Sequence, residues 1–158
     1  MPNTPLKPSP LQILSSEFIE ISIKSCEATE DHGPGSIDVE RDIHLHHGED
    51  GEAWGIMLAI KLEAIEDQPP PPYTGHVVIR GGFRVHEDYT GDPERLIRIT
   101  AASMLYGATR EMLASLTARS VNGMMTLPSV SFFEDLPTQK PATKKRSSSK
   151  SSKSKALG

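Results

Sequence analysis

The stretch from Asp92 to Arg119, DPERLIRITAASMLYGATREMLASLTAR, has the pattern of one long helix. Asp92 is a good N-cap, and Pro93 suits the first helical position because its fixed φ fits a helix and its missing N–H is not needed there. Apolar residues then recur at spacings of three and four, as on one helix face: Ile97, Ala101, Met104, Leu105, Ala108, Met112 and Leu116. This spacing predicts an amphipathic helix of about 25 residues.

The same stretch is rich in small residues, which allow another helix to approach closely. The chain is also lean in aromatic residues, at 5% of the sequence, which favours oligomerisation over reliance on its own core. We therefore expect one part of the helix to pack against a second subunit. The expected interface residues are Met104, Gly107, Ala108 and Met112.

Before the helix, the hydrophobic period changes to two, which is typical of half-buried strands. Four such segments occur, at residues 17–24, 37–46, 54–64 and 73–86. Short turns join them, except that four prolines at 69–72 form a stiff connector. The expected fold is therefore α+β: a four-stranded antiparallel meander sheet packed against one long C-terminal helix.

The alternation also predicts what each sheet face carries. In the first segment Ile19, Ile21 and Ile23 share one face, which we expect to point toward the core. The opposite face of the first three segments is acidic. The second segment has Arg41 as the one polar residue on its inner side, and Gly81-Gly82 in the fourth predicts a bulge or a close backbone approach.

The net charge of −4 averages two unlike parts of the chain. The last twenty residues carry seven basic residues and no acid, so the rest has 10 basic against 21 acidic residues. An acidic body argues against specific nucleic-acid binding. We predict a flexible N-terminus at 1–10, one domain at 11–137, and a disordered basic Ser/Lys tail at 138–158.

Other features bear on the compartment. The sequence has no apolar stretch of about 18 residues that could cross a membrane, and the N-terminus MPNTPLKPSP lacks the apolar core of a secretory signal peptide. A single cysteine, Cys26, cannot form an internal disulfide, which fits a reducing compartment. These features predict a cytoplasmic protein without membrane insertion.

No catalytic constellation stands out. His44 and His46 share a strand face and could bind one metal ion with Asp42 or Glu63, although a solvated strand face explains them as well. Cys26 has no neighbouring residues of the kind that activate a thiol, so we expect it to have a structural role or none. We expect no enzyme activity, and a small metal-binding protein or enzyme using His44 and His46 remains an alternative.

A different signal comes from apolar residues that the predicted core does not require. Such residues could cap the core or a subunit interface, or form an adaptable surface for unfolded clients, since unbranched methionine can repack against many partners. The candidate client-binding residues are Met57, Val78, Met124, Met125, Leu127, Phe132 and Phe133.

The helix and the residues after it resemble the SecB export-chaperone family. The resemblance is carried by residues 104–119, with an aromatic residue, a small residue and an Arg-Glu pair, and by Leu127, Pro128, Val130 and Phe132, which match a Leu-x-Pro-x-(Val/Ile)-x-Phe segment. The specific stretch covers about 30 residues, and the order of elements matches over residues 12–136.

This resemblance implies a cytosolic, ATP-independent holdase that needs no cofactor. Family members are homotetramers, dimers of dimers, that bind unfolded preproteins along apolar grooves and pass them to SecA through an acidic sheet face. The matching residues here are Glu20, Asp38, Glu40, Asp42 and Glu63. The family's second helix and often acidic C-terminus are replaced by a basic tail, which leaves the SecA contact open. Relatives that serve as antitoxin chaperones in toxin–antitoxin systems offer an alternative function.

Overall fold

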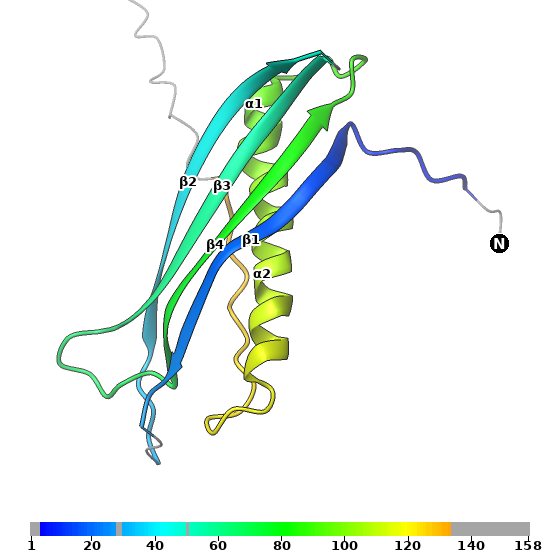
Figure 1. Cartoon of the computed structure of the whole chain (residues 1–158). Coiled ribbons are helices and arrows are strands. Elements are labelled where there is room, and N and C mark those ends of the chain that lie inside the picture. Colours follow the sequence, from blue (N-terminus) through cyan, green and yellow to red (C-terminus); the bar gives the residue numbers. More distant parts are fainter. Residues whose placement is uncertain (1–3, 28–29, 50, 134–158) are drawn as a thin grey trace, which may run out of the picture.

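The computed structural model describes residues 4–27, 30–49 and 51–133, which form a curved sheet with a long helix along one face (Figure 1). The strands are β1 (Leu11–Ser25), β2 (Gly35–Gly48), β3 (Gly51–Ala64) and β4 (Tyr73–Val85). The helical part consists of α1 (Pro93–Leu96), a π-helical turn η1 (Ile97–Ala101) and α2 (Ala102–Thr117). The predicted α+β fold, a four-stranded antiparallel sheet with a C-terminal helix, is confirmed. The predicted basic tail lies outside the described residues.

The strand order is β1-β4-β3-β2, so only the last three strands form a meander. β1 pairs with β4 instead of β2, which corrects the simple meander that the sequence predicts. The connection from β1 to β2 runs beside the proline connector, where Cys26 N–H donates to the Pro72 carbonyl and Gly33 N–H donates to the Pro70 carbonyl. β1 and β2 are therefore the two edge strands.

Two irregularities in β1 change which side chains face the core. The pairing register with β4 shifts between Ile13 and Ser15 and again between Phe18 and Glu20. Each shift places one extra residue in β1. Ile19 lies in the second shift and is 52% exposed, so its predicted inward orientation is wrong, whereas Phe18 pairs with Ile79 and is half-buried.

The glycine pair of β4 marks a close approach of the helix. A Cβ atom at Gly81 would lie 3.0 Å from a methyl carbon of Leu105 on α2. A side chain of the helix therefore approaches the backbone closely at this pair, and the register shift between Ile13 and Ser15 lies opposite, in β1.

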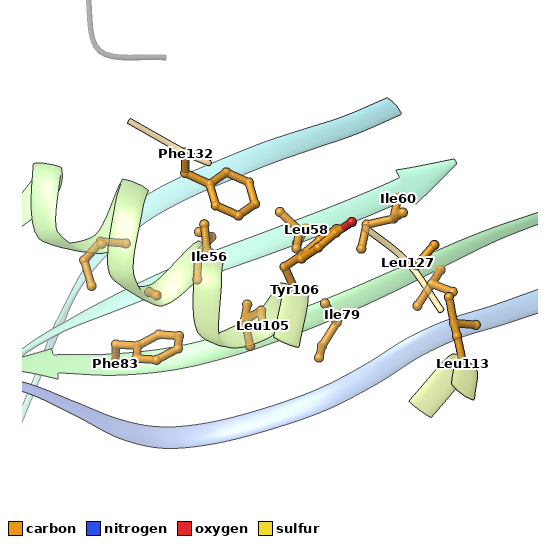
Figure 2. Close-up of a cluster of buried hydrophobic side chains, with 14 of the residues drawn as sticks. Ile56, Leu58, Ile60, Ile79, Phe83, Leu105, Tyr106, Leu113, Leu127 and Phe132 are labelled. Atoms are coloured by element: carbon orange, nitrogen blue, oxygen red, sulfur yellow. The ribbon is translucent and has the colours of Figure 1, made fainter. Parts of the chain in front are cut away.

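The core lies between the helix and the inner faces of β3 and β4 (Figure 2). The largest fully buried side chains come from both strands and from the helix: Ile56, Leu58, Ile60, Val77, Ile79, Phe83, Ile97, Leu105 and Leu113. Along the helix, Leu105, Thr109, Leu113 and Thr117 are buried, whereas Met104 and Leu116 are exposed. Over this part of the helix the buried stripe is thus displaced by one position from the predicted one, which leaves Met104 and Leu116 on the open side.

Candidate client-binding surface

After the helix, the chain turns back and runs along the seam between helix and sheet. We call residues 124–133 the C-terminal segment. It forms neither helix nor strand, and in the described part of the chain none of its backbone groups pairs with another backbone group. Its main chain is held by side chains of the helix instead.

Three helical side chains make these contacts. Arg110 Nε donates to the Leu127 carbonyl at 2.9 Å, and the Tyr106 hydroxyl donates to the Pro128 carbonyl at 2.9 Å. Met125 N–H donates to Thr117 Oγ1 at 2.7 Å. Thr117 Oγ1 in turn donates to the carbonyl of Leu113, so this buried hydroxyl both donates and accepts a hydrogen bond. The helix thus presents a row of polar groups to an extended chain.

The turn before the segment is fixed to one end of the sheet. The Tyr73 hydroxyl donates to the Gly123 carbonyl, and Asn122 Nδ2 donates to the carbonyls of Cys26 and Pro72 at 2.9 and 2.7 Å. Gly123 has a φ of +75°, a backbone conformation that favours glycine. Sequence reasoning missed Tyr73 and Asn122, because their partners lie 50 and 96 residues away.

Two side chains anchor the segment in the core. Leu127 is 3% exposed and Phe132 is 4% exposed. The Phe132 ring contacts the Tyr106 ring edge-on at 6.0 Å, and the Arg41 guanidinium lies 5.1 Å from its centroid. Arg41 also donates to the Arg98 carbonyl in η1 at 3.1 Å, which explains a polar residue on the inner side of β2. Burial raises the pKa of Tyr106, and nearby Arg110 opposes this shift in part.

These placements correct part of the expected client surface. Leu127 and Phe132 are core residues in this chain. Their side chains are buried, so they are not accessible to a client that binds the surface. Met125 is half-buried, whereas Met124 and Phe133 are 64% and 62% exposed. Val130 is also exposed, and only its place in the family pattern distinguishes it in the sequence.

A shallow groove runs beside the segment at one end of the sheet. Its volume is about 230 Å³, and one wall is formed by residues 125–128. The other side is apolar and includes Ile37, Leu62, Pro71, Pro72 and Tyr73. The groove and the exposed residues of the C-terminal segment together make the candidate client-binding surface.

The outer face of the sheet carries a second apolar area. Met57 is 37% exposed and Val78 is half-buried. Leu14 and Ile19 are 49% and 52% exposed at the register shifts of β1, and alternation alone could not have found them. The five predicted acidic residues are exposed on three strands, β1, β2 and β3. One of them, Glu20, lies 3.1 Å from His76.

The histidine pair lies on the same outer face. The rings of His44 and His46 contact each other edge-on at 4.3 Å, beside an open hollow of about 550 Å³. Within the described ranges, no group of three or more His, Cys, Asp or Glu side chains could hold a metal ion. Neither of the expected third ligands, Asp42 and Glu63, therefore lies close enough to this pair to complete a metal site.

The expected oligomer-interface residues lie on the open side of α2. Met104 is 42% exposed, and within the described part of the chain no atom beyond the helix's own nearby backbone lies within 4 Å of a Cβ built at Gly107. Ala108 and Met112 are half-buried, and Leu116 adds a further exposed apolar side chain. Among the described helices, none is long and apolar enough to cross a membrane.

Comparison with known proteins adds a fold relationship. No protein-family model and no curated protein sequence matches the chain. Among solved structures, a protein of unknown function from Streptococcus agalactiae matches at a TM-score of 0.47 and 12% identity, over 75% of this chain and 97% of its own. The Mycobacterium tuberculosis SecB-like chaperone Rv1957, solved in complex with a ChAD peptide from the HigA1 antitoxin Rv1956, matches at a TM-score of 0.51 and 18% identity, over 77% of this chain and 91% of its own. At this identity the likeness concerns the fold alone: the chain folds as a SecB-like chaperone does.

Proposed function

We propose that this protein is a SecB-like, ATP-independent chaperone that holds unfolded client segments on apolar surface. The observation that carries the proposal is the C-terminal segment, on which Met124, Val130 and Phe133 are exposed and residues 125–128 line an apolar groove. Several exposed apolar side chains on one segment next to a groove are typical of an interaction site. The fold shared with a SecB-like chaperone supports the same conclusion.

Holding a client in this way requires no cofactor and no catalysis. Burial of apolar surface between client and groove stabilises the complex by about 25 cal/mol for each Å² removed from water. Methionine side chains such as Met57 and Met124 can adopt several rotamers, so one surface can accept different sequences. A cytoplasmic location fits a protein that works on newly made, unfolded chains.

Two client classes are compatible with this surface. The complex of Rv1957 with an antitoxin peptide favours an antitoxin client for this chain. The second class is preproteins destined for the Sec translocase, in which case the acidic outer face would contact SecA. That face consists of Glu20, Asp38, Glu40, Asp42 and Glu63. Binding assays with antitoxin and preprotein segments, and with SecA, separate the two classes.

The holdase proposal predicts that the purified protein suppresses aggregation of an unfolded client without ATP. In the double variant Met124→Ser/Phe133→Ser we expect about tenfold weaker client binding, because two large apolar contacts are lost. Leu6→Ser is the matched control, since Leu6 is 98% exposed at the other end of the chain. The measurement is light scattering of the client against chaperone concentration.

Absence of suppression at a several-fold molar excess would contradict the holdase proposal. Metal analysis of the same preparation tests the alternative of a metal-binding protein, which requires near-stoichiometric metal at His44 and His46.

We further propose a homotetramer in which the open side of α2 is covered by other subunits. Met104→Glu should then shift the protein to smaller species in sedimentation velocity, because a carboxylate would be buried in an apolar contact. Thr90→Glu, in the exposed loop before the helix, adds the same charge and should leave assembly unchanged. A wild-type monomer at micromolar concentration would rule out this assembly.

A further inference from the structure

The C-terminal segment is bound in the manner of a peptide ligand. Side chains from outside the segment contact its main chain at Met125, Leu127 and Pro128. Two of these three contacts go to carbonyl oxygens, which every residue type offers. Apart from the two anchors, Leu127 and Phe132, the seam therefore places few demands on the sequence that it holds.

The segment also lacks the contacts that would make it a permanent part of the sheet. Within the described chain it has no ladder partner. Its release breaks side-chain contacts and exposes two anchors, but leaves all four strands paired. The groove beside residues 125–128 gives an incoming chain a place to bind before the segment leaves.

From this geometry, and resting on the chaperone function proposed above, we infer that the seam itself is a client site and that the C-terminal segment is its built-in competitor. The client is an extended peptide with large apolar residues five positions apart, at the places of Leu127 and Phe132. Such a client displaces the segment, accepts hydrogen bonds from Arg110 and Tyr106 on two of its carbonyl oxygens, and fills both anchor positions.

The pattern of donors defines the client further. Because Arg110 and Tyr106 both donate to carbonyls, a proline between the anchors is accepted, as Pro128 is in the segment. The Phe132 position, with the Arg41 guanidinium at 5.1 Å, favours an aromatic residue. The Leu127 position is buried among apolar residues and favours an aliphatic one.

Competition from the segment lowers the apparent affinity for clients. The apparent dissociation constant equals the intrinsic value divided by the fraction of molecules in which the seam is open. A substitution that weakens the segment without changing the seam raises this fraction. The client should then bind more tightly, which a merely structural role of the segment does not predict.

The test uses the full-length protein and a labelled synthetic peptide with the sequence of residues 123–133, GMMTLPSVSFF. Leu127→Ala in the protein should tighten peptide binding by about tenfold or more, because the competing anchor is truncated. Ser129→Ala is the matched control, since Ser129 lies between the anchors on the same segment but is exposed, and it should leave the peptide affinity within about twofold of wild type. A peptide with serine at both anchor positions should not bind. Fluorescence anisotropy measures all of these affinities.

A second variant guards against loss of folding. If circular dichroism shows that Leu127→Ala is unfolded, Phe132→Leu makes the milder change at the other anchor and should also tighten binding. Unchanged or weaker peptide binding in a folded anchor variant overturns the inference. In wild type, hydrogen exchange at residues 124–133 should increase when the peptide is added, and unchanged protection there also overturns it.

The inference and the chaperone function fail in different ways. If wild type does not suppress client aggregation, the chaperone proposal fails, whatever the peptide does. If wild type suppresses aggregation but Leu127→Ala gains no peptide affinity, the chaperone proposal stands and the competitor role is wrong.

Discussion

Replacement of Gly75 by alanine is expected to destabilise the protein by about 3 kcal/mol or more, because it combines backbone strain with a main-chain clash. Gly75 has a φ of +144°, which L side chains rarely adopt. A Cβ atom there would overlap the carbonyl oxygen of Ser22 and lie 2.9 Å from the Ile23 Cα, both in the paired edge strand β1. The variant must therefore separate β1 from β4 locally, and urea unfolding followed by circular dichroism measures the loss.

Gly51→Ala is the matched control for this prediction. Gly51 has a φ of +101°, but among the described residues no atom other than those of its chain neighbours lies within 4 Å of a Cβ built there. This variant carries the backbone strain without the clash and should cost about 1 kcal/mol. Equal losses of unfolding free energy in the two variants would mean that β1 leaves room for a side chain at position 75.

Truncation of Phe83 to alanine is expected to cost about 3–5 kcal/mol of unfolding free energy, because the ring fills the core and its removal leaves a cavity. Phe83 is fully buried on the inner face of β4. The measurement is again the free energy of unfolding in urea.

Phe133→Ala makes the same chemical change on the surface. Phe133 is 62% exposed, so its loss should change the free energy of unfolding by no more than about 0.5 kcal/mol. The same variant should weaken client binding if the proposed function is right. Comparable destabilisation by the two variants would show that the end of the C-terminal segment belongs to the core.

The long helix was predictable because its signals are local. Asp92 accepts a hydrogen bond from Glu94 N–H at 3.0 Å, as its N-cap position indicates. The helical residues then run from Pro93 to Thr117, close to the predicted length. An N-cap and an i to i+4 repeat depend only on neighbours within a turn or two, so one sequence suffices to find them.

The face of β1 was not predictable in the same way. Alternation assumes a regular ladder, and the shift between Phe18 and Glu20 exists only because β1 pairs with β4, more than fifty residues away. Ile19 is exposed as a result. The order of the strands depends on the same long-range pairing, and turn signals between consecutive strands favour the simpler meander.

The candidate site likewise has features that the sequence predicts and features that depend on tertiary contacts. The sequence marks the residues of the C-terminal segment as apolar. Burial of Leu127 and Phe132, and exposure of Met124 and Phe133, follow from where the segment lies against the helix. The contacts that place it join residues 8 to 22 positions apart and involve main-chain atoms that no sequence pattern marks.

By itself, the sequence determined the four strands, the long helix and the acidic outer face, since hydrophobic period and capping act over a few residues. Only the tertiary structure decided the order of the strands, the orientation of β1 and the division of the C-terminal segment into buried anchors and exposed contacts. The physical reason is that burial is a property of the assembled layers. An apolar residue without a period, such as Leu127, becomes core or surface according to which neighbours it meets.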